Sequence, residues 1–242
     1  MAFGPTAACY AKPDRWFSAA VVTNGAGSPR TGDYANFTDE QMQEVRRVEQ
    51  NNAATVGDYG FMAQMGYSST QVKMPGNDRL ISEIAELICA AHPDTVYTHN
   101  LADKHDTHVA VALRTIAALR RLPACDRPKK VYSLEVWRGL DWLCDEDKVC
   151  FDTSERPHLA AALLGVFDSQ IAGGKRYDSA ALGRRLANAT FFASHDTDQA
   201  TSLSYGLDIT DLVYSDADPA EFISHFINRF QQEVIKRLEA LS

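Results

Sequence analysis

Short apolar runs alternate with longer amphipathic segments along this 242-residue chain, and that alternation limits the folds open to it. The runs at residues 18–23, 95–98 and 130–133 have the length and composition of buried strands. Apolar residues at helical spacing lie between them, at 42–56, 80–88 and 109–119. Strands that alternate with helices of about ten or more residues are typical of βαβ units. The sequence therefore predicts an α/β fold with a mostly parallel sheet.

Several of the expected helices carry their own end signals. Thr38-Asp39-Glu40-Gln41 is a capping box, in which the Thr hydroxyl and the Gln amide satisfy free N–H groups, and Gly57 supplies the stop. Pro93 ends the second helix, so we interpret His92 as a helix-end residue. Asp218-Pro219-Ala220-Glu221 begins a long last helix with an apolar stripe. Because no repeat or clear linker interrupts the chain, we expect one domain over residues 1–242.

The densest group of titratable side chains follows the run at 95–98. Thr98 to His108 contains three histidines and two aspartates, and a helical pattern begins directly behind it. Open α/β folds build their sites at such carboxyl ends of strands. His105 and His108 can face one point where the chain turns into a helix, and Asp103 or Asp106 can orient an imidazole. The alternative is a solvated, hydrogen-bonded loop, because H-x-x-H is a common pattern.

Three other polar segments leave their interpretation open. The glycine-rich loop at 24–30 lacks the spacing of a phosphate-binding loop, which favours a flexible loop at a strand end. His195 and Asp198 have the spacing of a His-x-x-Asp ligand pair, and a capped turn explains them equally well. Residues 173–178 form a basic turn that could contact an anionic substrate or simply carry surface cations.

Charge and cysteine content exclude several classes of protein. A net charge of −8 without a cluster of Lys and Arg argues against a nucleic-acid or anionic-membrane partner. The five cysteines are odd in number and show no C-x-x-C spacing, which favours a reducing compartment over a disulfide framework. No apolar run approaches the ~20 residues of a membrane span, and the start has no secretory signal pattern. We therefore expect a cytoplasmic protein of unknown oligomeric state.

An ordered series of motifs runs from about Phe17 to about Leu119. The motifs are Val21-Val22-Thr23-Asn24-Gly25, Arg46-x-x-Glu49 with Ala53-Ala54 and Gly57, Pro93-Asp94-x-Val96-Tyr97-Thr98-His99, and Asp103-x-His105-x-x-His108. In order and spacing this series resembles the PIG-L/LmbE family of zinc-dependent de-N-acetylases. Residues 135–138, 169–171 and 173–178 are similar to a bacterial branch of that family. The resemblance implies a Rossmann-like three-layer fold with a Zn²⁺ site at the carboxyl ends of the strands.

The resemblance also implies a role for individual residues. His108 matches the third protein ligand of zinc, and His105 matches the histidine that stabilises the oxyanion or protonates the leaving amine. Asp103 matches a supporting catalytic carboxylate in the same loop. Arg46 and Asn24 are the implied substrate-binding residues. The implied reaction is attack of zinc-activated water on the N-acetyl or other N-acyl group of an amino sugar or related small amide.

This chain departs from the family pattern at two places. Where many members have His-Pro-Asp-His, it has His105-Asp106-Thr107-His108, so Asp106 or Asp103 must orient the catalytic histidine. The family opens with a strand and His-x-Asp-Asp, which supply two zinc ligands and the general base, and no such motif precedes Phe17. We therefore expect that the chain begins just downstream of that motif and that the first strand is missing.

These departures leave three hypotheses open. The first is a zinc-dependent N-deacetylase, for which about three protein ligands and an open position for water are needed. The second is a catalytically silent truncated homologue that at most binds a carbohydrate or a protein. The third keeps catalysis by recruiting His195 and Asp198 as replacement ligands.

Overall fold

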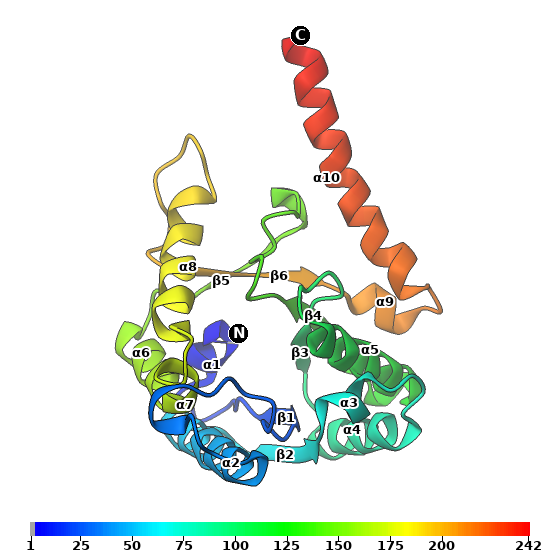
Figure 1. Ribbon diagram of the computed structural model, residues 1–242. Helices are drawn as coiled ribbons and strands as arrows, with labels where there is room; N and C mark the ends of the chain where they lie inside the picture. Colours follow the sequence, from blue (N-terminus) through cyan, green and yellow to red (C-terminus); the bar gives the residue numbers. More distant parts are fainter. Residues whose placement is uncertain (1–2) are drawn as a thin grey trace. The chain divides into compact units, whose positions relative to one another are not determined.

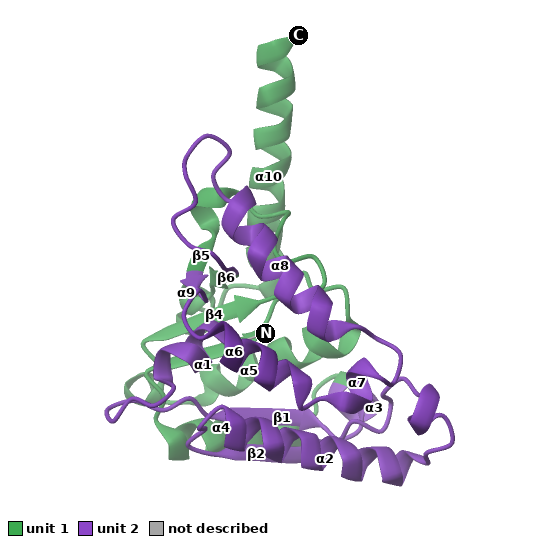
Figure 2. Ribbon diagram, turned by 90° about the vertical axis from the view of Figure 1, so that its left-hand side faces the viewer, with its two compact units in different colours: residues 1, 73–150, 205–242 green, residues 2–72, 151–204 purple. Residues whose placement is uncertain are grey.

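The computed structural model describes residues 3–242, which divide into two compact units (Figure 2). Unit 1 comprises residues 73–150 and 205–242, and unit 2 comprises residues 3–72 and 151–204. The boundaries between the units fall before the last residue of helix α3 (Ser69–Lys73) and inside strands β5 (Val149–Asp152) and β6 (Leu203–Asp208). Within residues 3–242, no helix combines the length and the hydropathy needed to cross a bilayer.

Unit 1 is built around the parallel pair β3 (Thr95–His99) and β4 (Lys130–Leu134), which are in register from Thr95 opposite Lys130 to His99 opposite Leu134 (Figure 1). Strand β6 pairs antiparallel with the other edge of β4, and the sheet order is β3-β4-β6-β5. The helices of this unit are α4 (Asp78–Ala91), α5 (Asp106–Arg121), α9 (Thr210–Tyr214) and α10 (Pro219–Leu241), with 3₁₀ turns η2 (Ala124–Asp126) and η3 (Asp145–Asp147). Helix α5 packs against both α4 and β3.

The apolar stripes predicted for α4 and α5 form much of the buried surface of unit 1. Leu80 and Ile116 are almost fully buried, as is Val131 on β4. Helix α4 begins where Asn77 Oδ1 accepts a hydrogen bond from the Leu80 N–H, and it ends where His92 adopts a left-handed φ of 43°. The interpretation of His92 as a helix-end residue is therefore confirmed.

Unit 2 contains the parallel pair β1 (Ala19–Thr23) and β2 (Met62–Tyr67). Its helices are α1 (Phe3–Cys9), α2 (Asp39–Val56), α3 (Ser69–Lys73, which ends at the unit boundary), α6 (Pro157–Gly165), α7 (Asp168–Ile171) and α8 (Tyr177–Phe191), with a 3₁₀ turn η1 (Gly32–Tyr34). Helix α2 packs against β2, α6 and α7, and α6 packs against α8. Phe3, Ala53 and Leu159 belong to the apolar cluster that these helices enclose.

The predicted α/β class and the mostly parallel pairing are confirmed. The capping box of α2 is present in both directions, between Thr38 and Gln41, and Gly57 is the C-cap. Among residues 3–242 the strands form two sheets, and β1 and β3 each pair with a neighbouring strand on one side only.

Strands β2 and β6 and helix α8 were not predicted from the sequence. The single domain over residues 1–242 stays a prediction, since both units are assembled from two segments of the chain.

Candidate active site

The candidate site lies in the loop between β3 and α5, and Asn100 fixes the start of this loop. The Asn100 N–H donates to Leu134 O at 3.0 Å, one step beyond the last paired residues of β3 and β4. Its buried side chain donates from Nδ2 to Ser133 Oγ (2.9 Å) and accepts from the Ala102 N–H at Oδ1 (2.8 Å). Because the backbone N–H and both side-chain atoms of Asn100 have hydrogen-bond partners, the chain can turn sharply at the carboxyl edge of the sheet.

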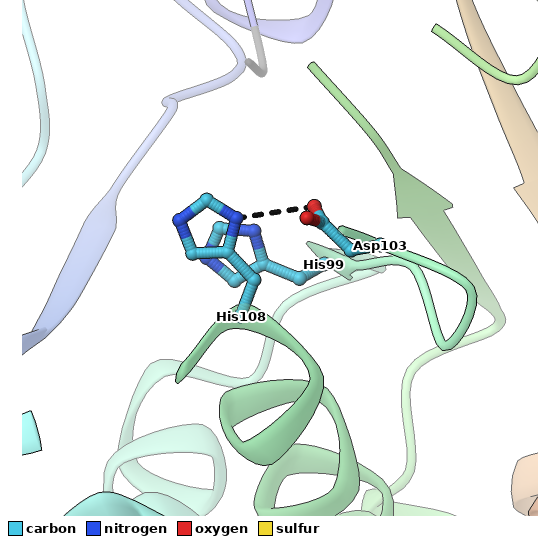
Figure 3. Close-up of side chains that lie close together, drawn as sticks. All are labelled: His99, Asp103 and His108. Carbon is cyan, nitrogen blue, oxygen red and sulfur yellow. Dashed lines mark hydrogen bonds and ion pairs between the residues drawn. The ribbon is translucent and has the colours of Figure 1, made fainter. Parts of the chain in front are cut away.

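Asp103 organises the rest of the loop. Its carboxylate is fully buried; Oδ1 accepts from the His105 N–H at 2.8 Å, and Oδ2 lies 3.1 Å from His108 Nδ1 (Figure 3). Since an ionised carboxylate can only accept hydrogen bonds, the His108 ring donates from Nδ1. The unprotonated atom of His108 is then Nε2, and the side chain is about 29% exposed. The carboxylate thus fixes both the tautomer and the orientation of the ring.

The three histidines of the loop lie together. The His99 and His108 rings are stacked, with centroids 4.0 Å apart and planes inclined by 9° (Figure 3). The ring of His105, an exposed residue, stacks on His108 at 4.7 Å and 30°. The structure therefore brings together the predicted residues Asp103, His105 and His108, and it adds His99.

Burial keeps two of these rings neutral. It lowers the pKa of His99 to about 3, and the neighbouring His108 acts in the same direction. Burial also lowers the pKa of His108, although the hydrogen bond to Asp103 opposes this shift. A metal ion binds the neutral form of imidazole, so both rings are in the protonation state of a ligand at neutral pH.

The residue types of this cluster are those of a zinc site, but the ring geometry limits which atoms can share one ion. His99, Asp103 and His108 each place a donor atom within 4.8 Å of the others, and two histidines with a carboxylate are a common catalytic zinc set. An imidazole binds a metal in the plane of its ring at about 2.1 Å. Parallel rings 4.0 Å apart cannot both do so. His108, oriented by Asp103, therefore fits as a ligand through Nε2, whereas His99 would have to rotate.

A second buried carboxylate adjoins this loop. Glu135 directly follows β4, and its side chain is fully buried, with Oε2 3.4 Å from both the Leu140 N and Trp142 Nε1. Burial raises the pKa of Glu135, and the charge of Asp103 acts in the same direction. Arg138 Nη1 donates to Ala102 O at 2.6 Å and lies 3.6 Å from Glu135 Oε1. The segment after β4 thus holds the loop that carries the histidines.

The two predicted substrate-binding residues lie in unit 2. Arg46 forms an ion pair with Glu49, and its guanidinium lies 5.1 Å from the centre of the Phe167 ring. Gly25, next to Asn24, has a φ of 79°, and a Cβ atom there would lie 2.5 Å from Arg46 Cγ. Asn24 Oδ1 accepts from the Ala26 N–H at 3.1 Å. Arg46 therefore packs on the loop that contains Asn24, and their role in substrate binding stays a prediction.

Glu49 is more completely enclosed than its place in the motif suggested. Its side chain is 7% exposed, and it accepts hydrogen bonds from the Ser169 N–H (2.7 Å), from Ser169 Oγ (2.8 Å) and from Arg46. The Arg46-x-x-Glu49 motif and residue 169 were noted separately in the sequence, and the fold of unit 2 joins them.

His195 and Asp198 lie in the loop after α8, also in unit 2. Both residues are exposed, and Asp198 Oδ2 accepts from Thr190 Oγ1 at 3.0 Å. They do not belong to the donor groups that converge among residues 3–242. Their recruitment as replacement ligands stays a hypothesis.

Comparison with known proteins gives a family match for the first part of the chain. The family model described as "PIG-L: GlcNAc-PI de-N-acetylase" matches residues 1–119. This segment of the chain is a PIG-L family match. The matched segment includes the whole Asp103–His108 loop and ends within α5. A search of curated proteins found no match.

Solved structures share the fold of this chain at low sequence identity. A conserved protein of Thermus thermophilus has a TM-score of 0.64 at 17% identity, over 86% of this chain and 87% of its own. N,N'-diacetylchitobiose deacetylase of Pyrococcus horikoshii has a TM-score of 0.64 at 12% identity, over 89% and 80%. The 4-carboxy-2-hydroxymuconate hydratase GalB of Pseudomonas putida has 0.63 at 14%, over 86% and 89%.

These neighbours confirm the fold, and the chemistry of the chain must be argued from its site. Deacetylases and a hydratase share this fold, so the fold alone does not select a reaction. The family match, together with the deacetylases among the neighbours, supports a deacetylase-type hydrolase.

Two features of the site were not assigned from the sequence. His99 was counted in the cluster without a role, although its place as the last strand residue before the polar loop was a usable signal. Glu135 follows the neighbouring parallel strand, and polar groups after adjacent parallel strands meet at one edge. Its contact with the Asp103 loop could not be read from spacing, because 32 residues separate the two.

Proposed function

We propose that this chain is a metal-dependent hydrolase that removes an N-acetyl or other N-acyl group from an amino sugar or a related small amide. The observation that carries the proposal is the Asp103–His108 pair, in which a buried carboxylate orients an imidazole whose Nε2 is free to bind a metal. The family description supports the reaction. The P. horikoshii neighbour, a deacetylase of N,N'-diacetylchitobiose, supports an acetylated amino sugar as the first substrate to test.

Each residue of the loop has a defined task in this proposal. His108 holds the metal through Nε2, and Asp103 keeps the proton on Nδ1 so that Nε2 stays available. His105, an exposed residue 4.7 Å from the His108 ring, donates a proton to the leaving amine. A bound Zn²⁺ would supply Lewis acidity toward the acyl carbonyl and lower the pKa of water.

The free cysteines bear on the cellular compartment in which we propose that the protein acts. Cys9, Cys89, Cys125, Cys144 and Cys150 carry free thiols in the structure. Because thiols persist under reducing conditions, we place the activity in the cytoplasm.

Two measurements on the purified chain test the proposal. We expect about one zinc per chain by elemental analysis, and acetate release from N,N'-diacetylchitobiose. His108→Ala should lose both, because it removes the oriented Nε2 donor. His105→Ala should retain the metal and lose turnover, because the exposed ring transfers a proton and does not bind the ion. Unchanged hydrolysis in His108→Ala would disprove the proposal.

A second candidate function is a silent homologue that binds a carbohydrate without cleaving it. The stacking of His99 on His108 favours it, because only one ring of the pair can reach an ion as the side chains lie. Calorimetry with N-acetylglucosamine separates the candidates. Sugar binding without zinc binding or acetate release would support the silent homologue, whereas stoichiometric zinc and turnover would exclude it.

A further inference from the structure

Arg185 is a buried cation without a counter-charge, on helix α8 of unit 2 (Figure 2). The residue is only 7% exposed, and its Nη1 atom is buried without a hydrogen-bond partner. No carboxylate of residues 3–242 pairs with it, and Met1 and Ala2 have no carboxylate side chain. Because buried charges in proteins are paired, an unpaired guanidinium indicates a ligand of opposite charge.

Apolar groups surround the Arg185 guanidinium. Leu182, one turn earlier on α8, packs against the apolar cluster of unit 2, and Ala189, one turn later, is buried. The guanidinium carbon lies 4.8 Å from the centre of the ring of Phe3, which begins α1. A cation–π contact offsets only part of the cost of taking a guanidinium out of water. The Phe3 ring therefore does not replace a counter-ion.

The side chain of Arg185 keeps its charge at neutral pH. Burial lowers its pKa to about 10, and no neighbouring charge contributes to the shift. A group with this pKa is protonated in nearly every molecule at pH 7. Buried lysines and carboxyl groups can become neutral in such surroundings, whereas this arginine cannot. The positive charge is thus a permanent feature of the interior of unit 2.

Two other arginines of unit 2 show how the chain treats this group elsewhere. Arg46 is 15% exposed and forms an ion pair with Glu49. Arg156 stacks on the ring of Tyr10, with its guanidinium carbon 5.0 Å from the ring centre, but it is only half-buried. Of these three arginines, only Arg185 combines burial with the lack of both a carboxylate and water.

The charge and the surroundings of Arg185 select the type of anion. One guanidinium balances a single negative charge, whereas a phosphate group carries about −1.5 to −2 at neutral pH. A carboxylate is singly charged, and its two oxygens match the planar fork of a guanidinium. A short apolar tail on that carboxylate would pack on Phe3 and Leu182.

We propose that Arg185 binds the carboxylate of a small apolar monocarboxylic acid, for which propionate is a probe, beside α1 in unit 2. Nη1 donates to a carboxylate oxygen, and the apolar tail of the acid contacts the Phe3 ring. Since Phe3 covers the guanidinium, its ring must shift when the acid enters. The site uses no residue of the Asp103–His108 loop, so it does not depend on the proposed hydrolysis.

Isothermal titration of the purified chain with sodium propionate, in a buffer free of other carboxylates, tests the site. We expect one site per chain with a dissociation constant of roughly 1 mM or below. Arg185→Met keeps an apolar side chain and removes the fork, so it should weaken binding at least about tenfold. Arg156→Met is the matched control, because it removes the other arginine that stacks on an aromatic ring. It should bind propionate as the original chain does.

Thermal unfolding separates a binding role of Arg185 from a structural one. Without propionate, Arg185→Met should unfold at the same temperature as the original chain or at a higher one, because an unpaired buried charge has been removed. Propionate should raise the unfolding temperature of the original chain and not that of the variant. Arg185→Lys keeps the charge without the fork, and about threefold to tenfold weaker binding is expected if the methionine variant does not fold.

Four outcomes would overturn the proposal. The first is the absence of saturable propionate binding up to about 10 mM. The second is inorganic phosphate that binds as tightly as propionate at equal ionic strength. The third is a lower unfolding temperature of Arg185→Met without propionate, which would make Arg185 a structural cation. The fourth is a dimer in sedimentation velocity that propionate dissociates, which would assign the carboxylate to a second copy of the chain.

Discussion

Two buried carboxylates, Asp103 in unit 1 and Glu49 in unit 2, organise the two motifs of this chain in different ways. Asp103 accepts from one backbone N–H and from the His108 ring, whose Nε2 is left available. Glu49 accepts from both donors of Ser169 and from Arg46, which in turn packs on Phe167. Asp103 thus orients a ring whose Nε2 atom can bind a metal, whereas Glu49 ties α2 to α7 within unit 2.

Two similar motifs of titratable residues can therefore have different roles. Arg46-x-x-Glu49 and Asp103-x-His105-x-x-His108 both pair a carboxylate with a cationic or titratable side chain. Only the second leaves a metal-binding atom of the pair without a partner in the described chain. Substitutions at Glu49 and at Asp103 should distinguish a pair that stabilises the fold from a pair that serves catalysis.

The largest effect is expected for Glu49→Ala. Removal of the carboxylate leaves the Arg46 guanidinium, 15% exposed, without its counter-charge, and also leaves two donors of Ser169 unpaired. Breaking a buried pair in this way costs about 3–5 kcal/mol. Urea denaturation measures the loss. The control on the same helix is Glu44→Ala, which removes an exposed ion pair to Arg47 and should destabilise the protein much less, because water screens that pair. Equal losses in the two variants would contradict the assignment of Glu49 as a stabilising residue.

Asp103→Asn should instead act on metal affinity. The substitution keeps the shape of the side chain and removes the negative charge that fixes the His108 tautomer. Changes of this kind typically weaken metal binding by about 10–100-fold. Competition with a chromophoric chelator gives the zinc affinity. Asp106→Asn is the control, because Asp106 is exposed at the start of α5, and it should bind zinc as the original chain does. Zinc affinity that is equal in both variants would remove Asp103 from the site.

Arg138→Ala should loosen the histidine loop without removing a ligand. Arg138 donates to Ala102 O at 2.6 Å, and its side chain is 49% exposed, so the bond is worth about 1 kcal/mol. Amide hydrogen exchange over residues 100–108 should accelerate by roughly fivefold, the factor that corresponds to this free energy. Lys104→Ala, a change of an exposed cation in the same loop, should leave the exchange rates as they are. If the loop is equally protected without Arg138, the segment after β4 does not hold it.

The smallest effect is expected beside Glu49, at the exposed pair of Tyr34 and Asp168. Tyr34 donates to Asp168 Oδ2 at 2.6 Å, and this hydrogen bond raises the pKa of Tyr34 to about 12. The folded state therefore prefers the neutral phenol more than the unfolded chain does. The resulting stability is fully present below pH 10 and is lost as the pH rises from 10 to 12. Tyr34→Phe should cost at most about 1 kcal/mol. It should remove a group that titrates near 12 in the absorbance at about 295 nm, and loss of a group titrating near 10 would contradict the assignment.

Local signals in the sequence were sufficient to predict the helices whose ends are capped by a specific side chain. Thr38 and Gln41 cap α2, and Asp218 caps α10 through the N–H groups of Ala220 and Glu221. Strand β2 was missed because Met62–Tyr67 has neither β-branched residues nor a regular alternation. Strand β6 was missed because its pairing with β4 spans more than 70 residues. Propensity and capping act over a few residues, whereas such pairing depends on distant segments.

The sequence by itself predicted the α/β class, the resemblance to the PIG-L family, and the grouping of Asp103, His105 and His108 in one loop, because these residues lie close together in the sequence. The tertiary structure decided which atoms face each other. It placed Asp103 on Nδ1 of His108 and not on Nε2, stacked His99 beside that ring, and brought Glu135 to the loop. It also left the apolar side of α10 uncovered. The contact of Glu135 depends on packing between segments that are distant in sequence. The contacts of His108 with Asp103 and His99 depend on how the loop folds back at the edge of the sheet, which residue spacing does not specify.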